Sequence, residues 1–252
     1  MYIEKVVDAK KYIFRSKYIG AGFTAKCFLL KDGRLLKLYH KDSYNKYVLF
    51  KQHENMIDFL NSLSKISNDS FIGPNGVLLN ESKEVIGYFM DYKKAKTLKR
   101  INSNTYIQSI ITSIPKLEED TMKISEERYR IFDMHLRNIL FDNQFYIIDL
   151  DGGNYSNYQI DCICKYNIRD LCLIIIDGLF QNNDPDMKLS FYDQELNNIY
   201  NKIYLNGDIN SLYDFINYLC EIIKLENPSI KEIRKSANKV LKKEKVLHYY
   251  SY

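Results

Sequence analysis

The order of hydrophobic patterns along the chain constrains its fold more than any other feature. In the first third, short apolar runs are separated by turn residues, as in "KCFLLKDGRLLKLYH", where Asp32-Gly33 suits the positive backbone dihedral angles of a tight hairpin. Only residues 44–66 in this part repeat their apolar residues at helical spacing. The sequence therefore predicts a small β-rich lobe with one helix, residues 1–92, followed by a larger and mainly helical lobe, residues 93–252.

The individual elements follow from the same patterns. Strands are predicted at about 12–20, 26–30, 34–40, 76–80 and 84–92, with two short ones at 138–141 and 145–148. Helices are predicted at 104–127, 168–182, 190–205, 209–225 and 228–245, the last one opened by Pro228. This is an α+β fold in a single two-lobed domain. A cleft between two such lobes is a common place for a ligand.

Composition and charge indicate a folded domain and give no sign of nucleic-acid binding. The chain has 252 residues, of which 46% are apolar, so it can bury a substantial core. Its formal charge of +4 is too small to identify a nucleic-acid-binding protein, and no nucleic-acid partner is expected. Two locally basic segments, 93–100 and 231–245, are either solvated helix faces or surfaces for an acidic partner.

The apolar runs and the cysteines are the features that bear on localisation. The longest apolar run, "LCLIII" at 171–176, is too short to span a bilayer, and the N-terminus lacks the apolar core of a signal peptide. The five cysteines have no paired metal-ligand spacing, which favours reduced thiols. We therefore expect a cytoplasmic protein without a membrane span.

A glycine turn, "GAGFTA" at residues 20–25, lies between two predicted strands. A dinucleotide-binding turn must lead directly into a helix, whereas this one leads into a hairpin. A glycine turn between antiparallel strands can lie over a triphosphate and offer it backbone N–H groups, because Gly20 and Gly22 carry no side chain that blocks the approach. The alternative is an ordinary turn that happens to contain glycine.

Lys37 lies in the apolar strand "LLKLY", where a cation is costly to bury unless an anion meets it. Phosphate oxygens beneath the glycine turn would supply that anion. Glu54 from the following helix is the second candidate, and Asp58 of the same helix is an alternative to Glu54. A lysine at a strand edge with its amine in solvent is the simpler interpretation.

The stretch "DMHLRNILFDNQFYIIDLDGG", residues 133–153, holds polar side chains around a short apolar run. Phosphoryl transfer needs a carboxylate that orients the attacking hydroxyl and hard oxygen ligands for Mg²⁺. Asp133 would orient the hydroxyl, and Asn138 and Asp149 would bind the metal. The competing interpretation is that these residues cap the turns of a β-hairpin.

These segments, in this order, resemble the protein kinase-like superfamily across residues 12–182. "DMHLRNILF" is similar to the catalytic loop, "YIIDLDG" to the strand that leads into the metal-binding Asp-Phe-Gly, and "IGAGFTAKC" with "LLKLY" to the glycine loop and lysine strand. "VIGYFMDY" resembles the strand and hinge beside the adenine, and "NIRDLCLIIIDGL" resembles the helix whose leading Asp170 supports the catalytic loop.

The resemblance implies a two-lobed kinase-like fold that uses ATP and Mg²⁺. It implies catalytic roles for Asp133, Lys37 and Glu54, and metal binding by Asn138 and Asp149. Met90 would be the gatekeeper, backbone groups of the next two residues would face the adenine edge, and Cys27 would form part of the adenine roof. The implied ATP-binding residues are Gly20, Ala21, Gly22, Cys27, Lys37, Met90, Asp91 and Tyr92.

The sequence also departs from the kinase pattern. Ile131-Phe132 replaces the usual His-Arg, and His135 replaces the catalytic-loop lysine. "DLD" leaves two candidate metal ligands, Asp149 and Asp151, of which Asp149 is preferred because it directly follows the strand.

The acceptor is the least constrained part of the assignment. The segment that follows "DLD" is short and contains no Ala-Pro-Glu, although a protein kinase normally builds its peptide platform there. Three functions therefore stay open. The first is a bacterial Ser/Thr protein kinase-like enzyme that moves the γ-phosphoryl group of MgATP to a hydroxyl. The second is a small-molecule kinase similar to aminoglycoside or choline phosphotransferases, and the third is a pseudokinase that regulates a partner.

Overall fold

The computed structural model describes residues 1–6, 9, 13–40, 55–132, 134–182, 187–242 and 246–247. The chain divides into two compact units. The first consists of Met1–Lys94 with Ile148–Gly152, and the second of Ala95–Ile147 with Gly153–Tyr252. Residues 148–152 therefore belong to the first unit although they are distant from it in the sequence. The assignment of residues 1–252 to one domain with lobes 1–92 and 93–252 stays a prediction.

The first unit is built on a six-stranded sheet with strand order β1-β5-β6-β4-β3-β2. Its strands are β1 (Tyr2–Lys5), β2 (Lys17–Ala21), β3 (Ala25–Leu29), β4 (Arg34–Tyr39), β5 (Gly76–Leu79) and β6 (Val85–Asp91). All pairs are antiparallel except β1 with β5, which is parallel. Five of these strands were predicted. β1 adds a sixth and makes the sheet mixed.

Local sequence explains the turns of this sheet. Gly33 has φ +88°, and Leu30 N donates to Arg34 O at 2.9 Å, which closes the predicted hairpin between β3 and β4. β2 is shorter than predicted because Arg15 has φ 64° and residues 13–15 form a turn. Buried apolar side chains hold the sheet together: Leu30, Leu36, Leu78 and Phe89.

One described helix, α4 (Met56–Lys65), accompanies the sheet, and the Asn55 side chain caps its N-terminus. It contacts the 3-10 helix η2 (Leu150–Gly152), which is the second segment of this unit. The predicted helix spans 44–66, and its part before residue 55 lies outside the described residues.

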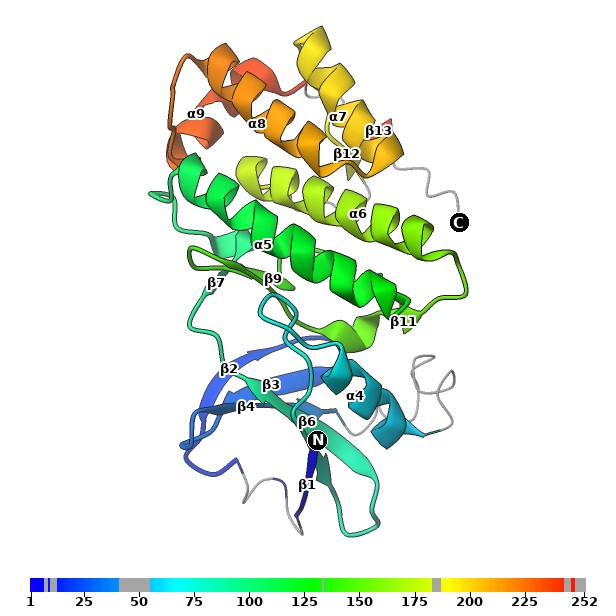
Figure 1. The fold of residues 1–252 in the computed structure, drawn as a ribbon. Helices are drawn as coiled ribbons and strands as arrows, with labels where there is room; N and C mark the ends of the chain where they lie inside the picture. The colour runs from blue at the N-terminus through cyan, green and yellow to red at the C-terminus, as the bar shows by residue number, and fades with distance from the viewer. Residues whose placement is uncertain are drawn as a thin grey trace. The chain divides into compact units, whose positions relative to one another are not determined.

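The second unit is mainly helical (Figure 1). Its helices are α5 (Ile107–Glu126), α6 (Ile160–Phe180), α7 (Gln194–Asn206), α8 (Ile209–Ile223) and α9 (Ile230–Val240), with the 3-10 helix η1 (Leu98–Arg100). α6 contacts all four of the other α-helices, so it is the central helix of this unit. The five helices were predicted at these places, but α6 begins at Ile160 rather than at residue 168. The buried positions of its first turns are Ile163 and the polar Asn167, so the apolar repeat is weak there.

Short strands complete the second unit. They are β7 (Lys96–Thr97), β8 (Tyr129–Arg130), β9 (Ile139–Phe141), β10 (Phe145–Ile147), β11 (Asn154–Tyr155), β12 (Met187–Lys188) and β13 (Val246–Leu247). β9 and β10 form the predicted hairpin, with β7 on the other side of β9. No described helix combines the length and the apolar character that a membrane crossing requires. All five cysteines are free thiols.

Candidate active site

Lys37 is the centre of a buried charge cluster in the first unit. It lies in the middle of β4, only 5% exposed, between β3 and β6 in the sheet. Its Nζ donates to Oδ1 and Oδ2 of Asp151, at 2.7 and 2.9 Å, and it also forms an ion pair with Asp149. The predicted need for an anion at Lys37 is therefore met by both carboxylates of "DLD".

Two tyrosine hydroxyls complete the surroundings of Asp151. Tyr88 donates its O–H to Oδ1 at 2.9 Å, and Tyr39 donates to Oδ2 at 3.2 Å. Burial by itself would raise the pKa of Asp151, but the charge of Lys37 and the hydrogen bonds from Lys37 and Tyr88 hold that pKa below its usual range. Asp151 is thus an ionised carboxylate whose two oxygens are both occupied by donors.

The same contacts fix the protonation of the partners. Burial by itself would lower the pKa of Lys37, yet the two carboxylates outweigh it and keep the pKa above its usual range. Burial and the charge of Asp151 raise the pKa values of Tyr39 and Tyr88. Lys37 therefore stays charged, and the two tyrosines stay hydroxyl donors.

Asp149 differs from Asp151 in exposure and backbone. Its side chain is 34% exposed, against 11% for Asp151. Its φ is 68°, in the left-handed region, where Asp is enriched among non-glycine residues but still costs energy. Burial and the nearby charge of Asp151 raise its pKa, and Lys37 offsets only part of that. A carboxylate held in this way can accept a cation from the open side.

The glycine turn has the structure of a hairpin tip. Gly20 and Ala21 of β2 pair with Cys27 and Lys26 of β3. A Cβ placed on Gly20 or Gly22 would meet nothing within 4 Å, so packing within the protein does not require glycine at either position. Cys27 pairs with Lys37 on its other side, and burial raises the pKa of its thiol to about 11.

The remaining predicted nucleotide contacts lie at the end of β6. Met90 is buried at 3% exposure, Asp91 is exposed, and Tyr92 is half-buried. Asp91 Oδ1 accepts a hydrogen bond from Asn75 at 2.9 Å. Glu54, predicted as a partner of Lys37, lies outside the described residues. Asp58, the alternative, belongs to α4.

In the second unit, α6 anchors the segment that leads into the predicted catalytic loop. Asp170 forms an ion pair with Arg130 and accepts a hydrogen bond from Arg169 Nε at 2.8 Å. Asn167 Oδ1 accepts from the backbone N of Ile131 and from Arg130, both at 3.0 Å, and its amide donates to Tyr129 O at 2.9 Å.

Sequence reasoning singled out Asp170 and missed Arg130 and Asn167. The spacing of Asn167 and Asp170 was the available signal for Asn167, because residues i and i+3 lie on the same face of a helix.

The other predicted loop residues are only partly described. Asn138 is 7% exposed, and its backbone N donates to His135 O at 2.9 Å. Asp133 lies outside the described residues. No group of three or more His, Cys, Asp or Glu side chains arranged to hold a metal ion occurs in the described part of the chain. Mg²⁺ is usually held by one or two carboxylates with water and substrate phosphates, so it does not require such a group.

Comparisons with solved structures identify the fold. The PknI kinase domain of Mycobacterium tuberculosis matches with a TM-score of 0.54 at 8% identity, over 88% of this chain and 93% of that one. A single-residue mutant of the same kinase domain gives 0.56 at 9% identity with the same coverage. The apo structure of a pseudokinase matches at 0.54 and 14% identity, over 95% of this chain and 93% of that one. No protein-family model and no curated protein sequence matches the chain. The chain therefore has a protein kinase-like fold, as the sequence predicted.

Proposed function

We propose that this chain is an ATP-dependent phosphotransferase that moves the γ-phosphoryl group of MgATP to a hydroxyl, and that the acceptor is a Ser or Thr of a protein. The observation that carries the proposal is Lys37, a buried cation on the strand behind the glycine turn, held between Asp149 and Asp151. Lys37 would exchange its contact with Asp149 for phosphate oxygens and keep its contact with Asp151.

Asp149 fits the role of the Mg²⁺ ligand and Asp151 does not. Mg²⁺, when bound, would neutralise charge on the phosphates. Asp149 offers a partly exposed carboxylate, whereas the oxygens of Asp151 already accept hydrogen bonds from Lys37, Tyr39 and Tyr88. Asn138 is proposed as a second ligand from the sequence pattern alone.

The glycine turn would bind phosphate through its backbone. The open space beside Gly20 and Gly22 supports this role, because a ligand can approach the main chain there without a side chain in the way. Cys27, Met90 and the segment 91–92 are proposed to line the adenine side.

Asp133 is proposed to orient the acceptor hydroxyl and take its proton. The network of Arg130, Asn167 and Asp170 supports this role, since it fixes the backbone at Ile131, two residues before Asp133 in the sequence.

The experiment that tests the proposal uses ATP labelled on the γ-phosphate. The protein is incubated with a Ser/Thr peptide mixture and with a panel of hydroxyl metabolites, and Lys37→Met and Asp133→Asn serve as inactive controls. We expect Mg²⁺-dependent label in peptides with the wild type only. Label confined to metabolites would replace the protein acceptor by a small molecule, and label in neither would reject phosphotransfer.

A second candidate function is a pseudokinase that regulates a partner. The observation in its favour is that Lys37 contacts both carboxylates, including the proposed metal ligand, so the charges of the site satisfy one another without a nucleotide. Thermal denaturation with ATP, with and without Mg²⁺, separates the two. A pseudokinase of this kind would show no nucleotide-dependent rise in Tm, whereas the proposed enzyme shows a rise that depends on Mg²⁺.

A further inference from the structure

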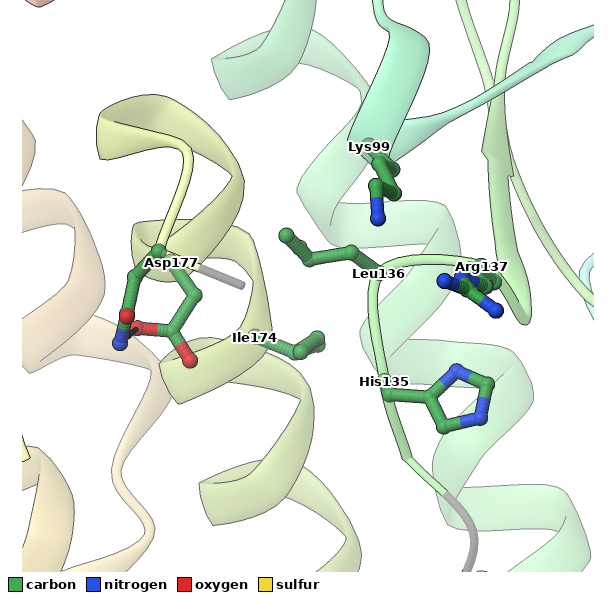
Figure 2. Close-up of a pocket in the computed structure, with 7 residues that line it drawn as sticks. Lys99, His135, Leu136, Arg137, Ile174 and Asp177 are labelled. Atoms are coloured by element: carbon green, nitrogen blue, oxygen red, sulfur yellow. Dashed lines mark hydrogen bonds between the residues drawn. The ribbon is translucent and has the colours of Figure 1, made fainter. Parts of the chain in front are cut away.

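A cavity of about 190 Å³ lies in the second unit beside the segment that resembles the catalytic loop. Figure 2 shows Lys99, Arg137 and His135 on one side of it and Asp177 on the other, with Leu136 and Ile174 between them. The cavity is lined by Lys99, His135, Leu136, Arg137, Ile174, Asp177 and Asn182.

The fold holds the walls of this cavity in place. The backbone N of Lys99 donates to Leu136 O at 3.1 Å, which ties η1 to the loop. Both segments also pack against α6 at Gly178, where a Cβ would make ordinary van der Waals contacts, at 3.4 Å from Leu98 Cδ1 and 3.6 Å from Leu136 Cδ2. The basic side chains are therefore presented by anchored backbone.

The charge of the lining is positive. Lys99 is half-buried and Arg137 exposed, and no carboxylate of the described residues forms an ion pair with either. Across the cavity, burial raises the pKa of Asp177 to about 7, and a hydrogen bond from Asn182, 3.0 Å long, offsets only part of the effect. Near neutral pH, Asp177 thus cancels only part of the positive charge, and its protonated form can donate a hydrogen bond.

We propose that this cavity binds an oxyanion, a carboxylate or phosphate group, of the phosphoryl acceptor. That the bound group belongs to a phosphoryl acceptor rests on the proposed function. The anion site itself rests on the residues that line the cavity. Lys99 and Arg137 would supply charge-assisted hydrogen bonds, and the guanidinium suits a bidentate contact. The volume is below the range of about 300–1,000 Å³ that holds whole ligands, so the cavity takes one charged group and not a nucleotide.

Some of the residues that line the cavity lie close in sequence to the proposed general base. His135 follows the proposed base Asp133 by two residues, a reach of about 7 Å at most along the backbone. Under the proposed function, an acceptor held by its anionic group against Arg137 and Lys99 would be bound beside the loop that carries Asp133. This gives the predicted acidic partner of the basic segment 93–100 a defined contact at Lys99.

The test titrates the protein with inorganic phosphate in the absence of ATP. The double variant Lys99→Ala with Arg137→Ala is compared with Lys96→Ala with Arg100→Ala, which removes the same charge from exposed positions that do not line the cavity. We expect the phosphate Kd to rise about tenfold or more in the first double variant and less than about twofold in the second. Equal weakening in both, no phosphate binding by the wild type, or tighter binding of guanidinium than of phosphate would overturn the anion site.

Assays with different acceptors then show whether the anionic group belongs to a peptide or to a small phosphorylated alcohol. Peptides with an acidic residue next to the Ser or Thr are compared with neutral peptides, and phosphorylated alcohols with plain ones. We expect the anionic member of one pair to have a KM about tenfold lower than its neutral partner, and Lys99→Ala with Arg137→Ala to abolish the difference with kcat little changed. Equal KM values in both pairs would overturn the acceptor role.

The phosphate titration and the acceptor assay fail separately. Phosphate binding that depends on Lys99 and Arg137 supports the anion site even where no phosphotransfer occurs, and in that case the proposed function fails alone. Phosphotransfer without such phosphate binding refutes the anion site and leaves the proposed function intact.

Discussion

Asp151 holds the buried ammonium of Lys37 with both of its carboxylate oxygens, at 2.7 and 2.9 Å. The two residues are 114 positions apart in the chain. Tyr39 and Tyr88 also donate hydrogen bonds to Asp151, so both of its carboxylate oxygens already have donors within the protein. Asp149, the more exposed carboxylate, is the one that we propose as the metal ligand, and this division of roles can be tested residue by residue.

Asp151→Asn should destabilise the protein more than Asp149→Asn. Removing one charge of a buried, hydrogen-bonded pair lowers the free energy of unfolding by about 3 kcal/mol. Substitution of the partly exposed Asp149 should lower it by about 1 kcal/mol. Urea denaturation measures the free energy of unfolding, with the exposed Glu81→Gln as the control variant. Equal losses at positions 149 and 151 would contradict the assignment.

Tyr88→Phe should lower the free energy of unfolding by about 1–2 kcal/mol, because it removes a buried hydrogen bond to a charged group and leaves the ring packing intact. Tyr39→Phe should cost less, since its bond to Asp151 is longer, 3.2 Å against 2.9 Å. The same denaturation assay checks both variants. A larger loss at Tyr39 than at Tyr88 would show that this ranking is wrong.

Asp133→Ala should reduce turnover about 100-fold or more and leave the Kd for ATP nearly unchanged, because the proposed task of Asp133 concerns the acceptor only. Steady-state kinetics and nucleotide titration measure the two quantities. Asp142→Ala, at an exposed position in the turn between β9 and β10, is the matched control. Unchanged turnover in Asp133→Ala would reject the role.

Asp177→Asn should remove a pH dependence of stability. In the folded protein the pKa of Asp177 is about 7 instead of 3.8, so the folded state keeps a proton that the unfolded chain releases. The stability this gives is complete below about pH 4 and is lost as the pH rises to 7, by an upper limit of about 4 kcal/mol. Compared with the wild type, the variant should therefore gain stability between pH 5 and 8. A stability difference that does not change with pH would contradict the raised pKa.

Much of the fold follows from patterns within short segments. The hairpin at Gly33 needs only the Asp-Gly pair, and α7, α8 and α9 carry their own apolar faces and caps. β1 could not be predicted in this way, because it is short and mostly exposed and depends on a parallel partner far along the chain. Tyr2 stacks on Phe89, and Gly76 leaves room for the Tyr2 ring.

The candidate site was predictable in its residue types but not in its pairing. The need for an anion at Lys37 follows from a lysine in an apolar strand, yet nothing local shows that Asp151 meets it. The need for glycine at position 153 is likewise not visible in the sequence. A Cβ there would lie 2.3 Å from the Tyr129 hydroxyl, so packing within the second unit requires this glycine.

The most direct test of the central claim is calorimetric titration of ATP into wild type, Lys37→Met and Asp149→Asn, each in excess Mg²⁺ and in EDTA. We predict that Mg²⁺ tightens ATP binding by the wild type, that Lys37→Met weakens binding under both conditions, and that Asp149→Asn loses the gain from Mg²⁺ alone. An unaltered Mg²⁺ response in Asp149→Asn, or no ATP binding by the wild type, would contradict the account.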